Sequence, residues 1–105
     1  MPTFLVFGTH HSENCPMYNE KTRKVMMEYT SKRDGLLKKH GVKMIGSWTV
    51  IGEHLAVWIF EASSADAFGK YLMEPELMAV NAFETMEVKM AMSSEEVMKM
   101  LPKTK

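Results

Sequence analysis

The side chains best suited to chemistry are concentrated in residues 9–16, which read Thr-His-His-Ser-Glu-Asn-Cys-Pro. This stretch holds two of the four histidines, His10 and His11, and the only cysteine, Cys15. Imidazole groups titrate near neutral pH and serve as general acids or bases, and together with a thiolate they also bind transition metals. Because the stretch joins an apolar run to a helical pattern, it lies at the kind of junction where folds often place functional sites.

The composition is that of one ordinary globular domain, residues 1–105, with 46% hydrophobic and 25% charged residues. Thirteen basic residues balance thirteen acidic ones, and no basic stripe with interleaved aromatics is present, which argues against a nucleic-acid partner. A single cysteine cannot form an internal disulfide and suits a reducing compartment. Neither a signal peptide nor a membrane-spanning segment is evident, so we expect a cytoplasmic protein without a membrane partner.

The spacing of apolar residues predicts the elements that must position this stretch. Four strands are expected over residues 3–10, 42–51, 54–61 and 85–92. A first helix should begin at Pro16, with Cys15 or Asn14 as its cap, and should end at Gly41. The cap at Cys15 would place its sulfur near a helix dipole that favours the thiolate. A second helix capped by Ser63 or Ser64 is broken at residues 74–75 and resumes to about residue 82, and Ser93 caps a short C-terminal helix.

This order predicts an α+β, ferredoxin-like βαββαβ fold with an extra C-terminal helix. We expect a four-stranded antiparallel sheet in the order 4-1-3-2, with the helices on one face. Both faces of the sheet look apolar: the first strand offers Phe4 and Val6 on one and Leu5 and Phe7 on the other. Alternation also puts Met44 and Trp48 on one common face of the second strand. An apolar face of this kind is a docking surface, so we expect a homodimer with the two sheets face to face. Cover by the short tail helix alone is the alternative.

The element order, with the patterns Gly46-Ser-Trp48 and Gly52-Glu-His54-Leu-Ala-Val-Trp58, resembles the dimeric α+β barrel superfamily over nearly the whole chain. The chain looks closest to small uncharacterised members of that group. The resemblance implies a dimeric barrel, but members include small monooxygenases, isomerases, haem-dependent enzymes and ligand-sensing domains, so the fold leaves the function open. The His-His pair is also similar to one in small nickel-binding ferredoxin-like proteins.

The expected topology brings several distant segments to one edge of the sheet. These segments contribute His10, His11, Cys15, Glu53, His54, Asn81 and Glu84, whereas His40 lies at the opposite edge. Successive strand residues point to opposite faces, so His10 and His11 cannot both face the interior of the molecule. The sequence does not decide which of them does.

Three hypotheses about function follow, and we favour the first. It is a protein that binds a small apolar or aromatic molecule, as a cofactor-free enzyme of the monooxygenase or isomerase type. Its acid or base would be His10, His11 or His54, and its ligand-binding residues would be Trp48, Trp58, Phe60, Asn81 and Glu84.

The second hypothesis is a transition-metal or haem-binding protein. Its metal ligands would come from His10, His11, Cys15 and His54, because imidazole and thiolate suit zinc, nickel or copper and a histidine can be an axial haem ligand. The third is a non-enzymatic ligand sensor or interaction domain, in which the dimer itself matters and the histidines are dispensable.

Overall fold

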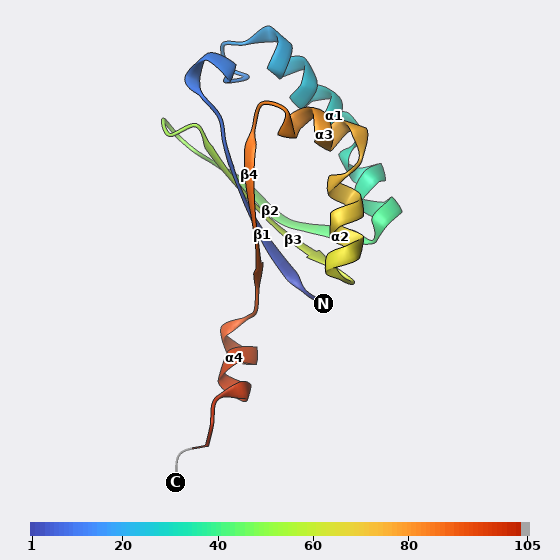
Figure 1. The fold of residues 1–105 in the computed structure, drawn as a ribbon, viewed down its shortest axis with the longest axis vertical. Coiled ribbons are helices and arrows are strands. Elements are labelled where there is room, and N and C mark those ends of the chain that lie inside the picture. The colour runs from blue at the N-terminus through green and yellow to red at the C-terminus, as the bar shows by residue number, and fades with distance from the viewer. Residues whose placement is uncertain (104–105) are drawn as a thin grey trace.

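A four-stranded antiparallel sheet forms the body of the protein in the computed structural model, which describes residues 1–103 (Figure 1). The strands are β1 (Thr3–Thr9), β2 (Val42–Val50), β3 (Leu55–Ala62) and β4 (Thr85–Ala91). They lie in the order β2-β3-β1-β4. From the other edge this order is 4-1-3-2, so the predicted ferredoxin-like topology is confirmed.

The helices α1 (Glu20–His40), α2 (Ala65–Leu72) and α3 (Pro75–Asn81) cover one face of this sheet (Figure 1). The core lies between them and the sheet, where Phe4 of β1 stacks on Phe68 of α2 with 4.5 Å between the ring centroids. The Ser64 side chain caps α2, and Pro75 opens α3. No helix within residues 1–103 combines the length and the apolar character needed to cross a membrane.

Helix α1 begins at Glu20, and the prediction that it begins at Pro16 was wrong. Residues Ser12–Asn14 form a short 3₁₀ helix instead, and the side chain of Asn19 caps α1 by accepting the N–H of Thr22 at 3.1 Å. An asparagine cap satisfies an amide that has no partner inside the helix. Cys15 therefore lies in the loop before the helix and does not cap it.

A β-bulge reverses the faces of β2 in its second half. The register with β3 shifts between Met44 and Gly46, so that Met44 pairs with Phe60 on the helix side and Trp48 pairs with Val57 on the open side. One extra residue in a strand moves every later side chain to the other face. The expectation that Met44 and Trp48 share a face was wrong for this reason.

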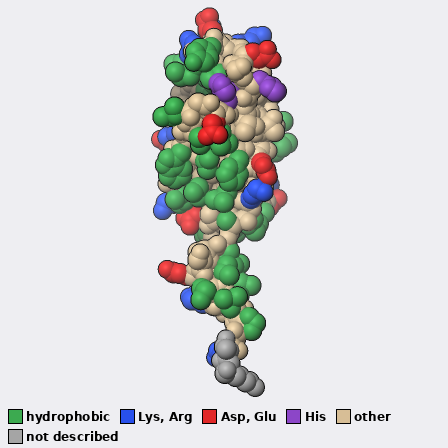
Figure 2. All heavy atoms as spheres, turned by 90° about the vertical axis from the view of Figure 1, so that its left-hand side faces the viewer, with side chains coloured by type: hydrophobic (Ala, Val, Ile, Leu, Met, Phe, Trp, Pro, Cys, Tyr) green, Lys and Arg blue, Asp and Glu red, His purple; other side chains and the backbone are tan. Residues whose placement is uncertain are grey.

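The sheet face opposite the helices is left open by the described part of the chain. Figure 2 views this side and shows apolar side chains spread over it. Helix α4 (Ser94–Met100) extends beyond the end of β4, away from the body, and does not cover this face (Figure 1). The radius of gyration is consequently 15.9 Å, whereas a compact chain of this length has about 13 Å.

Candidate functional site

The candidate site lies where β1 ends, beside the hairpin that joins β2 to β3. The backbone N–H of His10 donates to the carbonyl of His54 at 3.3 Å, which ties the two segments together. His54 has a backbone φ of 52°, in the left-handed region that histidine adopts more readily than most residues do. The two imidazole rings meet edge to face, with 5.2 Å between their centroids. The hairpin thus holds His54 against His10.

His10 points to the helix side of the sheet, where it contacts a buried carboxyl group. Its Nδ1 lies 3.0 Å from Oε2 of Glu84, a residue that is only 3% exposed. Burial raises the pKa of Glu84 above its ordinary value, and the neighbouring imidazole lowers this pKa only in part. The contact fixes the orientation of the His10 ring and leaves Nε2 as the nitrogen that is available for chemistry.

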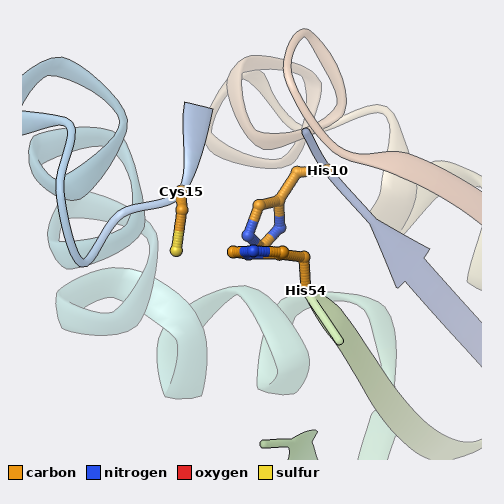
Figure 3. A group of neighbouring side chains, drawn as sticks. All are labelled: His10, Cys15 and His54. Atoms are coloured by element: carbon orange, nitrogen blue, oxygen red, sulfur yellow. The ribbon is translucent and has the colours of Figure 1, made fainter. Parts of the chain in front are cut away.

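The Nε2 atom of His10 is buried, and nothing in residues 1–103 hydrogen-bonds to it. Buried polar atoms are nearly always paired, so such an atom calls for a partner from outside the chain. Two further metal-binding side chains lie beside His10: one donor atom each from His10, Cys15 and His54 lie within 4.8 Å of one another. Figure 3 shows the three side chains pointing toward a common space from the end of β1, the following loop and the hairpin.

A pocket of about 290 Å³ adjoins this group of three side chains. Its walls are mostly apolar and include Met17, Met26, Leu55, Ala56 and Trp58. Ser47 and Thr49 of β2 supply hydroxyl groups, and His10, Cys15 and Glu84 supply the remaining polar atoms. Ligand pockets in proteins start at about 300 Å³, so this one suits a small molecule.

Gly8 makes room for the site, and the sequence analysis missed it. A Cβ atom at this position would lie 2.6 Å from Cζ3 of Trp58 and 2.9 Å from Oε1 of Glu84. Any larger residue would displace a pocket wall or the carboxyl group that holds His10. The sequence did contain a signal, because a glycine inside an otherwise apolar strand often marks a place where another group packs closely against the backbone. The sequence also did not identify Met26 and Leu55 as pocket residues, because apolar residues that line a pocket have the same spacing as apolar residues of the core.

Two of the expected polar residues lie away from the pocket. His11 is exposed and precedes the 3₁₀ helix, which answers the question of which histidine turns inward. Asn81 is exposed at the last position of α3. His40, at the opposite edge as expected, contacts Glu74 with 2.8 Å between Nε2 and Oε1.

The three expected aromatic residues are also separated. Trp58 lines the pocket, whereas Phe60 is 3% exposed in the core beside it. Trp48 is 55% exposed on the open face, where the bulge places it, and its ring covers Gly46.

Comparisons with known proteins match most of the chain to a family model and to solved structures. The family model is described as "Domain of unknown function (DUF3303)" and matches residues 3–105. No curated protein matches.

Three of the solved structures share the fold at low identity. An uncharacterized NIPSNAP domain protein from Burkholderia xenovorans is 11% identical with a TM-score of 0.60, over 90% of this chain and 95% of that one. Protein Atu4242 from Agrobacterium tumefaciens is 18% identical with a TM-score of 0.58, over 90% and 94%. A mutant of SnoaB, a cofactor-independent oxygenase from Streptomyces nogalater, is 16% identical with a TM-score of 0.54, over 89% and 92%. The expected resemblance to the fold of the dimeric α+β barrel superfamily is therefore confirmed.

Proposed function

Because the chain belongs to the DUF3303 family, whose function is unknown, we propose a function from the site itself. The protein binds a small, largely apolar molecule in the pocket beside His10 and removes a proton from it without a cofactor. One observation supports this most directly: Nε2 of His10 is buried and unpartnered within residues 1–103, while Glu84 holds the other nitrogen of the same ring.

In this proposal His10 is the general base and Glu84 orients it. With its proton on Nδ1 and donated to Glu84, the ring presents the lone pair of Nε2 to an acidic C–H or O–H of the ligand. The proton moves to Nε2, the electron pair stays on the ligand as an enolate, and the ionised carboxyl group stabilises the imidazolium. An enolate reprotonated at another carbon gives an isomer, and one that reacts with O₂ begins an oxygenation.

The pocket walls favour a flat, apolar ligand with a few polar groups. Trp58, Met26 and Leu55 offer aromatic and flexible aliphatic surface, and Ser47 and Thr49 offer hydroxyls that suit a carbonyl or phenol. SnoaB, which has this fold, is a cofactor-independent oxygenase, so the scaffold is able to host chemistry of this class. Function still has to be argued from the site, because one fold serves many activities.

We also propose that the working form is a homodimer joined through the open sheet faces. Leu5 and Phe7 of β1 pair with Ile59 and Val57 of β3 on this face, and Trp48 of β2 extends it. A sheet face that is exposed to water usually carries polar side chains, whereas these positions are apolar. A second copy is the partner that matches such a surface by symmetry.

The test is hydrogen–deuterium exchange of small aromatic ketones with an acidic C–H, β-tetralone among them, followed by NMR. We expect the protein to accelerate exchange, and His10→Asn to slow the catalysed rate by about 100-fold or more, the contribution of a positioned base. His11→Asn is the matched control: it removes the neighbouring exposed histidine and should leave the rate unchanged. A His10→Asn variant that exchanges at the wild-type rate would contradict the proposal, as would a panel in which no ketone exchanges faster with protein.

A further inference from the structure

The group formed by His10, Cys15 and His54 has more donor atoms than a general base requires. A base needs one nitrogen and one orienting partner, and Glu84 already supplies the partner. Yet the loop before α1 and the β2–β3 hairpin each bring one more metal-binding side chain to the same place (Figure 3). Within residues 1–103, this is the one group of three such side chains whose donor atoms lie so close together.

We propose that these three side chains form a binding site for a transition-metal ion of the zinc type. The ligands are Nε2 of His10, Sγ of Cys15 and one imidazole nitrogen of His54. Two imidazoles and a thiolate are a donor set that zinc and its neighbours prefer over calcium or magnesium, which take oxygen ligands. A haem is not favoured, since three donors that converge on one point suit a bare ion.

The spacing of the donors is compatible with such an ion. Zinc lies about 2.0–2.3 Å from nitrogen and sulfur ligands, which puts tetrahedral ligands about 3.5 Å apart. The three donor atoms are within 4.8 Å of one another, so contraction of about 1 Å completes the geometry. Three protein ligands leave the fourth position to water or to a molecule in the adjoining pocket, which is the arrangement of catalytic zinc sites.

The surroundings of the group also favour a cation. Histidine ligands commonly donate their second N–H to a carboxylate, and Nδ1 of His10 is 3.0 Å from Oε2 of Glu84. None of the described residues that line the pocket is a lysine or an arginine. On binding, the ion replaces the thiol proton of Cys15, which leaves to solvent.

Metal binding and proton transfer exclude each other, because both need the lone pair on Nε2 of His10. The metal-bound protein therefore lacks its base, and zinc should slow the ketone exchange described above. The inference does not rest on that activity, since metal binding is measured without any ketone.

The experiment uses untagged protein stripped of metal with a chelator, titrated with Zn²⁺ by calorimetry and with Co²⁺ in a spectrophotometer. We expect one ion per chain, and a thiolate-to-cobalt absorption band that Cys15→Ser abolishes. His54→Asn and His10→Asn should weaken binding, and Glu84→Gln should weaken it by about 10- to 100-fold, as loss of an outer carboxylate does. His11→Asn and Glu53→Gln are matched controls, because both residues are exposed near the site.

Less than one ion per chain, a cobalt spectrum without the sulfur band, or equal losses in His10→Asn and His11→Asn would overturn the proposal. Should Cys15→Ser not fold, alkylation of the wild-type protein decides instead: Zn²⁺ should protect the single thiol, and unprotected alkylation would refute the site. Ketone exchange without metal binding would overturn this inference alone, and metal binding without exchange would overturn only the proposed function.

Discussion

The site depends most on Glu84, whose carboxyl group is buried. Glu84 directly precedes β4, is buried, and lies against the space that Gly8 leaves open. Its contact with Nδ1 decides which nitrogen of His10 faces the pocket. Both proposed roles of His10, as base and as metal ligand, use the same orientation. Their separation therefore requires variants that change Cys15 or His54 and leave Glu84 in place.

The burial of Glu84 predicts how stability depends on pH. Desolvation raises the pKa of Glu84 in the folded protein above its ordinary value of 4.5, so the folded state holds the proton more tightly than the unfolded chain does. The stabilising contribution of the protonated form is complete below pH 4.5 and is lost as pH rises through the raised pKa. Glutamine is neutral at every pH. As pH rises from 4.5 through the raised pKa, the free energy of unfolding of Glu84→Gln should therefore fall less steeply than that of wild type.

Urea unfolding at a series of pH values measures this difference. Glu53→Gln, which changes an exposed carboxyl group, should follow the wild-type curve. A constant gap between wild type and Glu84→Gln over the whole range would contradict the argument.

Among the elements, α1 and α2 are joined by a hydrogen bond between two buried hydroxyl groups. Tyr29 of α1 and Tyr71 of α2 are paired with each other, and Tyr71 is 0% exposed. Desolvation raises the pKa of both phenols, so both stay neutral in the native protein. The pair fixes how α1, which forms one wall of the pocket through Met26, sits over the sheet.

The two hydroxyl groups should contribute to stability as a pair, so that losing both costs less free energy of unfolding than the two single losses added together. Tyr29→Phe or Tyr71→Phe alone leaves one buried hydroxyl without a partner, with an expected loss of about 1–3 kcal/mol in the free energy of unfolding. The double variant should lose less than the sum of the two, because no orphaned hydroxyl remains. Urea unfolding of all four proteins gives the coupling energy, with the exposed Tyr18→Phe as a control near zero. Strictly additive losses would refute the coupling.

At the scale of the whole molecule, the described part of the chain leaves much apolar surface exposed. One sheet face lies open, helix α4 projects beyond the sheet (Figures 1 and 2), and the apolar α4 residues Val97, Met98 and Met100 are exposed. A dimer through the open faces would cover the exposed sheet face. It would also offer helix α4 a surface to pack against. The pocket itself lies on the other side of the sheet, between it and α1.

A charge in the middle of the open face should separate the proposed dimer. Val57 pairs with Phe7 on one side and with Trp48 on the other, so Val57→Glu would bury an unpaired carboxylate between the sheets. An uncompensated buried charge costs about 3 kcal/mol or more, which corresponds to a rise of about 100-fold in the dissociation constant. Sedimentation should show wild type at twice the mass of the chain and Val57→Glu as a monomer. Met78→Glu, on the exposed side of α3, should remain dimeric, and a monomeric wild type would rule the dimer out.

The order of elements and of strands was readable from the sequence because its causes are local. Apolar spacing separated helices from strands, Gly41 ended α1, and Ser64 and Pro75 began α2 and α3. With the element order known, few antiparallel topologies remain, and the predicted one is present. The topology also indicated that segments far apart in the chain meet at one edge of the sheet.

What the local pattern left open depends on contacts between distant residues. The choice of Asn19 over Cys15 as a helix cap and the bulge that turns Trp48 outward are decided by competing hydrogen bonds, which have no signature of their own in the sequence. His10 and His11 are the same residue type at neighbouring positions. Only the packed structure distinguishes them, because it sets Glu84 beside one of them, 74 positions away along the chain, and leaves the other in water.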